Sequence, residues 1–322
     1  GSNGSTVGTL SGIYDSIRLL YARIGAENGL NYSAQSFSFN HHSGACASCG
    51  GLGVQLKCDP DAVIVSPELP LLEGAISDNK AVHYYGDVHG QFIATLQALS
   101  EHEKWDLTIP WRDLSPEQQF TILYGGDNTE WEVEWNFKTK SRSGTQQLKA
   151  KWLGLCNYLD DEYQRRLTAK NKAALDAVMH EVSCPTCKGS RLKEALLETK
   201  FLGLNIHELT QLTIAECSKK LEDLSAIDSR VEREIAKAIV PGIQRKMKPI
   251  LALGLGHLSM NRSVKSLSGG EQQRITLAGQ FSADLYGVTY VLDEPTIGLD
   301  AKQVGALMKL LNGLVAKGNT VV

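Results

Sequence analysis

Apolar residues recur at helical spacing in several long segments of the chain. In Ile13–Ile24 they return at every third or fourth position and Gly25 follows, which predicts a helix that ends at this glycine. The same spacing predicts further helices over residues 91–99, 160–182, 229–253, 271–285 and 304–315. Pro241-Gly242 lies inside the 229–253 segment, and because proline lacks the N–H that continues a helix, we expect a break there.

Other segments have the spacing or the composition of strands and loops. Trp131–Trp152 alternates aromatic or aliphatic residues with polar ones on both sides of a polar turn, which predicts a β-hairpin. Residues 288–292 form a short continuous apolar run, which predicts a buried strand, and another strand begins at Asn319. Prolines punctuate residues 59–72 and predict irregular structure there.

The 322 residues are enough for roughly two domains, and 42% apolar with 21% charged residues indicates a soluble globular protein. The net charge of −3 excludes a polyelectrolyte, so any nucleic-acid surface must be a local patch. No run of about 18 apolar residues and no secretory signal occurs, so we expect a cytoplasmic protein without a membrane span. We expect Gly1–Gly4 to be an expression remnant and the chain to be a truncated piece, because it stops inside an apolar run.

The chain has seven cysteines, and an odd number without an export signal argues against a disulfide framework. Two CxxC pairs, followed by Gly50 and Gly189, can present four thiolates to one zinc ion, although redox pairs or unligated thiols fit the spacing as well. The candidate ligands are Cys46, Cys49, Cys184 and Cys187. We interpret the nearby His41 and His42 as surface residues. The isolated cysteines are expected to be small apolar residues, buried or half-buried: Cys58, Cys156 and Cys217.

Leu267-Ser268-Gly269-Gly270-Glu271 combines a helix start with a phosphate-binding pattern. Ser268 can cap the helix that follows, and Glu271 stands where a capping box requires it. The two glycines let a phosphate approach main-chain N–H groups at a helix N-terminus, where the helix dipole favours anions. An ordinary capped helix has the same pattern, so both interpretations stay open at this point.

The run Val288–Pro295 is an apolar strand that ends in two carboxylates. Asp293 is placed to hold Mg²⁺, directly or through water, and Glu294 to orient or deprotonate an attacking water. Asp300 follows in Ile297-Gly298-Leu299-Asp300. The glycine signature, the acidic strand and the aspartate loop, in this order, are typical of ABC ATPases. The lysine loop GxxxxGK[ST] of a complete nucleotide site occurs nowhere in the chain.

Gly86-Asp87-Val88-His89-Gly90 matches the start of a metallophosphatase motif. A two-metal site of that class needs further aspartate, asparagine and histidine ligands downstream. Gly126-Asp127-Asn128 lacks the rest of the second motif, so we set this class aside.

The predicted hairpin also carries candidate DNA contacts. Period-two alternation puts its aromatic residues on one face and its lysines on the other. Residues 137–152 include basic side chains and no acidic one, which suits contact with phosphates, whereas a solvated hairpin face is the alternative. The candidate residues are Lys138, Lys140, Arg142, Lys149 and Lys151. A second, weaker basic patch consists of Arg245, Lys246 and Lys248.

With these motifs the sequence resembles the UvrA family, the damage-recognition subunits of bacterial nucleotide excision repair. The resemblance extends over almost the whole chain and includes both cysteine pairs and both nucleotide motifs. The segments that carry it are Ser5–Thr9, Ile13–Asp15, Phe37–Asn40, Gly44–Cys46, Cys49–Val54, Cys184–Leu192, Leu267–Ile275 and Tyr290–Leu299.

The resemblance implies an α/β plus α+β fold. Its parts would be a helical ABC-ATPase signature domain, a partial nucleotide-binding lobe, a zinc module and an inserted α+β domain. It implies structural Zn²⁺ on the four paired cysteines, and nucleotide contacts by Leu267–Glu271 and Asp300. It implies catalytic roles for Asp293 and Glu294, with ATP and Mg²⁺ in the complete protein. The expected boundaries are 1–56 for the start of the signature domain, 57–183 for the insertion, 184–280 for the rest of the signature domain and 281–322 for the lobe.

The implied function is DNA-damage recognition that couples ATP binding and hydrolysis to contact with double-stranded, above all damaged, DNA. The implied partners are a second ABC module, a homodimer partner and UvrB. Only residues 26–36 stand where family members carry their UvrB-binding segment, so we expect a short-form (class II) member or a deletion, and UvrB recruitment is in question. Without a lysine loop, we expect no ATP hydrolysis by this chain alone. The alternative is a non-catalytic, zinc-stabilised DNA-binding fragment.

Overall fold

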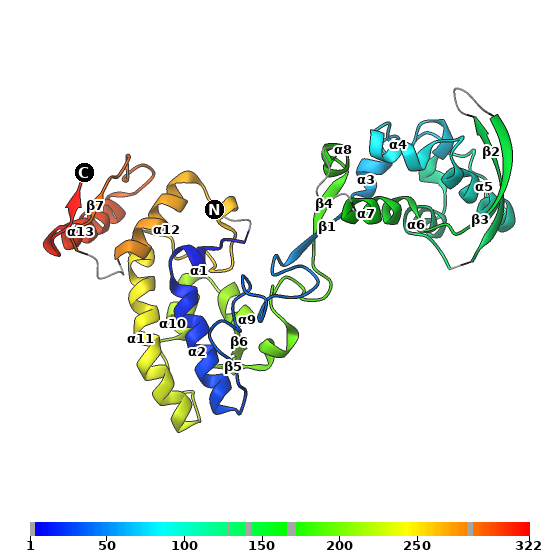
Figure 1. Cartoon of the computed structure of the whole chain (residues 1–322). Helices are drawn as coiled ribbons and strands as arrows, with labels where there is room; N and C mark the ends of the chain where they lie inside the picture. The colour runs from blue at the N-terminus through cyan, green and yellow to red at the C-terminus, as the bar shows by residue number, and fades with distance from the viewer. Residues whose placement is uncertain (1–3, 128, 139–142, 166–171, 282–285) are drawn as a thin grey trace. The chain divides into compact units, whose positions relative to one another are not determined.

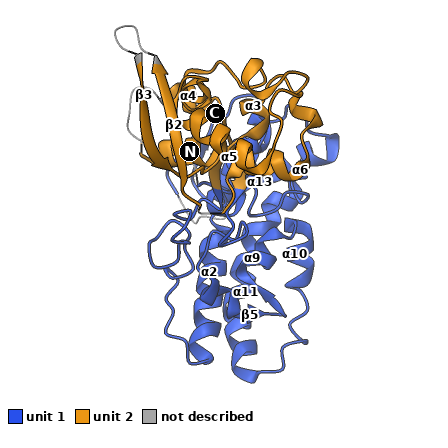
Figure 2. Cartoon of the chain, turned by 90° about the vertical axis from the view of Figure 1, so that its right-hand side faces the viewer, with its two compact units in different colours: residues 1–54, 183–322 blue, residues 55–182 orange. Residues whose placement is uncertain are grey.

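A computed structural model of the chain describes residues 4–127, 129–138, 143–165, 172–281 and 286–322. The chain divides into two compact units (Figure 2). Unit 1 comprises residues 1–54 and 183–322, and unit 2 is the stretch 55–182 inserted between them. The insertion that the resemblance implies spans 57–183, and unit 2 spans 55–182.

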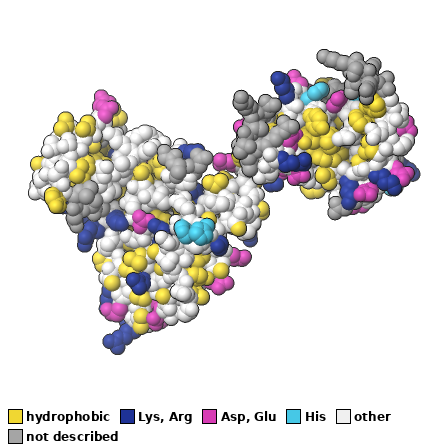
Figure 3. All heavy atoms as spheres, viewed as in Figure 1, with side chains coloured by type: hydrophobic (Ala, Val, Ile, Leu, Met, Phe, Trp, Pro, Cys, Tyr) yellow, Lys and Arg dark blue, Asp and Glu magenta, His cyan; other side chains and the backbone are white. Residues whose placement is uncertain are grey.

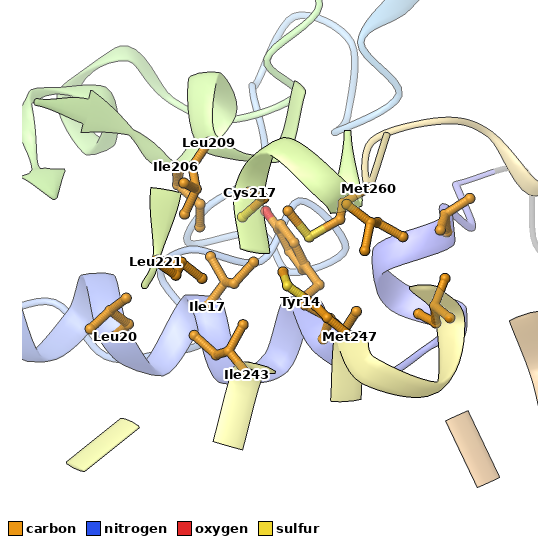
Figure 4. Packing of buried hydrophobic residues seen from close by; sticks show 14 of the residues in the cluster. Tyr14, Ile17, Leu20, Ile206, Leu209, Cys217, Leu221, Ile243, Met247 and Met260 are labelled. Carbon is orange, nitrogen blue, oxygen red and sulfur yellow. The ribbon is translucent and has the colours of Figure 1, made fainter. Parts of the chain in front are cut away.

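Unit 1 is mainly helical, and two of its long helices lie side by side (Figure 1). These helices, α2 (Ile13–Glu27) and α11 (Arg230–Ala252), share a core that includes Ile17, Ile243 and Met247, each 0% exposed (Figure 4). Full burial of one such side chain stabilises the fold by roughly 1.5–3 kcal/mol. The other helices of the unit are α1 (Val7–Leu10), α9 (Ile206–Gln211), α10 (Ile214–Lys220), α12 (Gly269–Phe281), α13 (Ala301–Ala316) and the short 3-10 helices η3 (Glu194–Glu198) and η4 (Val264–Ser266).

The strands of unit 1 are short. β5 (Lys200–Phe201) pairs antiparallel with β6 (Leu204–Asn205), and β7 (Thr289–Tyr290) pairs parallel with β8 (Thr320–Val321). The prediction of a buried strand over residues 288–292 is therefore wrong in its extent, since Val291 is 78% exposed. Parallel strands are normally covered on both faces, and among the described residues β7 has only β8 as a strand neighbour.

Unit 2 combines short helices with a long β-hairpin. β1 (Val54–Cys58) and β4 (Met179–Ser183) pair where the chain enters and leaves this unit. The hairpin strands β2 (Trp131–Lys138) and β3 (Ser143–Ala150) are antiparallel, which confirms the predicted hairpin. The helices are α3 (Pro60–Val63), η1 (Leu71–Glu73), α4 (Lys80–Gly86), α5 (Gln91–Glu103), η2 (Trp111–Asp113), α6 (Pro116–Tyr124), α7 (Leu155–Arg165) and α8 (Lys172–Asp176). The unit has its own core, built on residues such as Ile93, Leu96 and Leu155.

Three predictions about helices need correction. α2 does not end at Gly25 but runs to Glu27, and α11 is continuous through Pro241. In both places the free energy gained when the apolar faces of α2 and α11 pack in a shared core exceeds the local cost of a glycine or proline in a helix. The segment predicted as one helix over 160–182 is described as helical to Arg165 in α7 and again at Lys172–Asp176 in α8, but its last part forms β4 because those residues pair with β1. None of the described helices is long and apolar enough to span a membrane.

Candidate functional site

The two cysteine pairs meet in unit 1, although most of the chain between them forms unit 2. An isolated antiparallel bridge joins Ala45 to Leu192, and the Cys46 N–H donates to the carbonyl of Arg191 at 2.9 Å. The first turn is tight around Gly51, whose φ is +82°. A Cβ on this residue would lie 1.9 Å from the Phe39 carbonyl oxygen, so only glycine fits.

The four cysteine side chains form a compact cluster whose geometry suits one zinc ion. All four Sγ atoms lie within 4.8 Å of one another, and Sγ of Cys49 is 3.7 Å from Sγ of Cys187. Tetrahedral zinc with bonds of about 2.3 Å to sulfur requires S–S distances of about 3.8 Å. Exposed fractions between 0% and 8% keep the cluster away from water. The donor set therefore fits the structural zinc that the sequence predicts.

Main-chain N–H groups point at these sulfur atoms. The Gly53 N–H donates to Sγ of Cys49 at 3.2 Å. Burial acts to raise the pKa of Cys184, but hydrogen bonds from the N–H groups of Cys187 and Thr186 outweigh it and lower this pKa to about 6. Burial raises the pKa of Cys187 to about 12. The main-chain N–H groups around Cys184 therefore favour its thiolate form, which is the form that binds a metal.

The remaining cysteines and the two neighbouring histidines lie outside this cluster. Cys58, Cys156 and Cys217 are 3%, 1% and 0% exposed, as small core residues are. His41 contacts the hydroxyl of Ser43 through Nδ1 at 2.7 Å and packs against the ring of His42. Neither histidine belongs to the group of described residues that could share a metal.

The predicted capping box at the start of α12 is present. The Glu271 N–H donates to Oγ of Ser268 at 3.3 Å, and the Ser268 N–H donates to Oε2 of Glu271 at 2.9 Å. Hydrogen bonding from the Ser268 N–H lowers the pKa of Glu271, so this carboxylate is ionised at neutral pH. Gly269 and Gly270 are exposed beside it, and Leu267 packs partly buried against the core. The arrangement leaves bare backbone at a helix N-terminus that an anion can reach.

The acidic loop after β7 is held against α12 by two side chains of that helix. Gln273 donates to the carbonyl of Asp293 at 2.9 Å, and Arg274 donates to the carbonyl of Ile297 at 3.2 Å. The side chains of Asp293 and Glu294 are exposed, so both carboxylates are free to meet a ligand from solvent. Asp300 has a structural task as well, because its carboxylate caps α13 by accepting from the Gln303 N–H at 2.8 Å. The sequence patterns did not single out Gln273 or Arg274.

The hairpin separates its two faces as predicted. Val133 is buried and Trp135 donates its indole N–H to the His89 carbonyl at 2.8 Å, on the side that packs against α5. Lys149 lies on the opposite, exposed face. Of the candidate DNA contacts, Lys140 and Arg142 lie outside the described residues, and only the backbone of Lys138 is described.

The exposed hairpin face carries acidic residues next to its lysines. Lys149 pairs with Glu132 at 3.3 Å, and Lys151 pairs with Glu130 at 3.9 Å. Figure 3 shows basic and acidic side chains next to one another at several places on unit 2. The absence of acidic residues along 137–152 therefore does not make this face purely basic, because the partners come from the other strand.

The second basic patch lies on α11 and is only partly exposed. Arg245 and Lys248 are exposed, whereas Lys246 donates to the Gly12 carbonyl at 2.7 Å and is partly buried.

The metallophosphatase-like motif forms a local turn before α5. In this turn Asp87 accepts from the N–H of His89 at 3.0 Å. Among the described residues, no metal-binding group includes Asp87 or His89.

Comparison with known proteins finds a family model that matches most of unit 2. Residues 59–176 match the UvrA DNA-binding domain. This span is nearly the whole of unit 2, which comprises residues 55–182.

About nine tenths of the chain is similar to whole-length proteins of related name. UvrABC system protein A of Methanothermobacter thermautotrophicus is 34% identical over 91% of this chain and 30% of its own length. The protein of that name from Thermus thermophilus is 35% identical over 89% of the chain and 29% of its own length. The crystal structure of UvrA2 from Deinococcus radiodurans covers 98% of this chain and 40% of that chain, with a TM-score of 0.64 and 27% identity. The chain thus spans less than a third of the length of these curated relatives.

Proposed function

We propose that the chain takes part in DNA-damage recognition during excision repair, because about nine tenths of its length is similar to UvrA proteins. The observation that carries this proposal is the match of residues 59–176 to the UvrA DNA-binding domain, which coincides with unit 2. In this proposal unit 2 binds double-stranded DNA, and unit 1 carries the nucleotide signature. The proposal includes coupling between the two, so that DNA contact and nucleotide state influence one another.

The zinc site is proposed to be structural. Four thiolates close a tetrahedral site and leave no open position for substrate, so the ion holds the two turns together and does no chemistry. Cys46 and Cys49 come before unit 2 and Cys184 and Cys187 after it. Zinc on these residues would therefore fix both chain ends from which the DNA-binding unit departs.

The nucleotide motifs are proposed to act across an interface. Ser268–Glu271 offers a capped helix N-terminus with two exposed glycines, and Asp293 and Glu294 offer exposed carboxylates for Mg²⁺ and for water. The chain has no lysine loop for the β- and γ-phosphates, so the nucleotide that this signature contacts would be held by a second ABC module. The proposed ATPase is the complete protein, in a homodimer.

A second candidate function, DNA binding without ATP turnover, is favoured by a specific observation. The chain contains unit 2 and the cysteine cluster but no complete phosphate site, so it can serve as a zinc-stabilised DNA-binding fragment without turnover. Titration of the purified chain with damaged and undamaged duplex DNA, with and without ATP and Mg²⁺, separates the two. A preference for damaged DNA that responds to ATP supports damage recognition, whereas binding indifferent to ATP supports the fragment. No binding to either duplex at low salt would contradict both.

UvrB is a proposed partner whose usual binding segment is absent from this sequence. Only residues 28–36 connect α2 to the Phe37–Asn40 motif, and they contain no helix. Co-purification with UvrB tests whether another surface replaces the missing segment.

A further inference from the structure

One arginine contacts both halves of the cysteine cluster through its main chain. The carbonyl of Arg191 accepts from the Cys46 N–H at 2.9 Å, and its own N–H donates to the thiol of Cys187. Arg191 holds a left-handed backbone conformation, with φ of +68°, to make these two contacts. Such a conformation is costly for a residue with a Cβ, and the surrounding contacts must maintain it.

The side chain of Arg191 is fixed at several points. Its Nη1 donates to the Gly4 carbonyl at 3.0 Å, and its guanidinium lies 5.1 Å from the ring centre of Phe39. A Cβ on Gly53 would lie 2.9 Å from Cγ of Arg191, so the turn that follows Cys49 leaves space for this stem. The stem of Arg191 thus lies beside the turn whose Gly53 N–H donates to Sγ of Cys49, and its guanidinium lies near an aromatic residue of the core of unit 1.

A zinc-loaded four-thiolate site is negatively charged, and a fixed cation nearby would balance that charge. Four thiolates with one Zn²⁺ carry a net charge of −2, and the cysteines are at most 8% exposed. Buried charge without a partner is strongly unfavourable. Burial lowers the pKa of Arg191, whereas Tyr14, Cys49 and Cys187 act in the opposite direction through their negative charge. The neighbouring lysines in sequence, Lys188 and Lys193, are both exposed to solvent.

We propose that Arg191 is a positioning residue of the four-cysteine site, which balances the charge of the thiolates and so determines how tightly Zn²⁺ is held. This proposal rests on the proposed zinc site. Partners in the shell around a metal typically change affinity by about 10- to 100-fold when removed. Lysine at this position would keep the charge but lose the planar contact with Phe39 and the fixed direction of the guanidinium.

The test is carried out on the zinc-loaded 322-residue chain. Zinc dissociation constants are measured by competition with a chromophoric chelator for the parent chain, Arg191→Gln, Arg191→Lys and Lys193→Gln. We expect Arg191→Gln to weaken zinc binding by about 10-fold or more and Arg191→Lys to fall between it and the parent. Lys193→Gln removes the same charge two residues away from an exposed position, and we expect it to bind zinc like the parent.

Two further measurements separate charge from packing. Phe39→Leu removes the ring beneath the guanidinium, so a purely packing role for Arg191 would make this variant as weak as Arg191→Gln. The cobalt form of Arg191→Gln should keep the thiolate absorption bands of four sulfur ligands, which shows that the ligand set is intact although affinity has fallen. Equal zinc affinity in Arg191→Gln and the parent overturns the role of Arg191 alone. Absence of zinc binding in the parent chain overturns the zinc site itself and this inference with it.

Discussion

Lys149 on β3 stands directly opposite Glu132 on β2, and the two side chains form an ion pair of 3.3 Å on the exposed face of the hairpin. Both are largely exposed, at 69% and 80%, so the pair adds little to stability. Its consequence concerns recognition. A lysine that would meet a phosphate must first leave its glutamate, and that glutamate repels the same phosphate.

The first prediction follows from this pair. Glu132→Gln should tighten DNA binding by the isolated chain and steepen its salt dependence by up to about one unit, as one more lysine becomes available to release a counterion. Glu117→Gln, an equal change of charge at an exposed position on α6, serves as the matched control. The measurement is the slope of log affinity against log salt concentration for one duplex. If Glu132→Gln and Glu117→Gln behave alike, the exposed hairpin face does not contact DNA.

The second prediction concerns reversal of the hairpin lysines. Substitution of Lys138, Lys140, Lys149 and Lys151 by glutamate should weaken binding to a similar degree for all sequences, because phosphate contacts carry no sequence information. The salt slope should also become shallower. Unchanged slopes in this variant would place the DNA-binding surface of unit 2 elsewhere.

The third prediction is that the chain binds about one zinc ion per molecule. Cys46→Ala or Cys184→Ala should lose the metal and destabilise unit 1, because zinc binding contributes directly to folding free energy. Cys156→Ala is the control, as this buried cysteine belongs to the separate core of unit 2 and should leave zinc content unchanged. Elemental analysis and thermal unfolding provide the measurements. Full zinc occupancy in a Cys46→Ala, Cys184→Ala double variant would rule out the site.

The fourth prediction uses the two kinds of helical glycine. A Cβ on Gly242 in α11 would meet nothing within 4 Å, so Gly242→Ala should stabilise the chain by about 0.5–1 kcal/mol. A Cβ on Gly8 in α1 would lie 3.1 Å from the Met260 carbonyl oxygen, so Gly8→Ala should destabilise it by about 1–3 kcal/mol. Urea unfolding of both variants checks the difference. A change in the free energy of unfolding of the same sign in both variants would contradict the expected contrast between helix propensity at Gly242 and packing at Gly8.

The sequence could predict those features that neighbouring residues determine, but not those that depend on packing between distant segments. The capping box at Ser268 and Glu271 involves neighbours along one helix, and it is present as predicted. Each cysteine pair is recognisable from its CxxC spacing, but the approach of the two pairs to one another depends on a fold that inserts unit 2 between them. The continuity of α11 through Pro241 depends on packing against α2, and the pairing of Lys149 with Glu132 depends on strand register. No pattern within a single segment contains either of these.

The contacts of Arg191 could not be predicted from a motif for a related reason, although the residue lies in the Cys184–Leu192 segment. It follows the second cysteine pair closely, but its partners Cys46, Phe39 and Gly4 lie more than a hundred residues earlier in the chain. Its left-handed backbone has no signature, since residues other than glycine at positive φ have no reliable sequence pattern.

The last prediction concerns catalysis: this chain alone should not hydrolyse ATP at a measurable rate. Phosphoryl transfer depends on positioning and on stabilisation of charge at the transferred phosphate. Asp293 and Glu294 provide carboxylates for Mg²⁺ and water, and the N-terminus of α12 behind Ser268 provides a contact for a phosphate. No lysine loop cradles the β- and γ-phosphates, so a nucleotide has no fixed place on this chain.

Steady-state ATPase assays on the isolated chain, and on a chain with a lysine-loop segment restored, check this prediction. Turnover should appear only in the restored form, where Glu294→Gln should trap bound nucleotide and Ser268→Arg should prevent closure on it. Gln273→Leu offers a subtler variant, because its side chain holds the Asp293 carbonyl at 2.9 Å and its loss should lower the rate without removing either carboxylate. Robust turnover by the isolated chain that Glu294→Gln abolishes would mean that a phosphate-binding element exists within these residues, and the assignment of Ser268–Glu271 to a nucleotide held by another module would then be wrong.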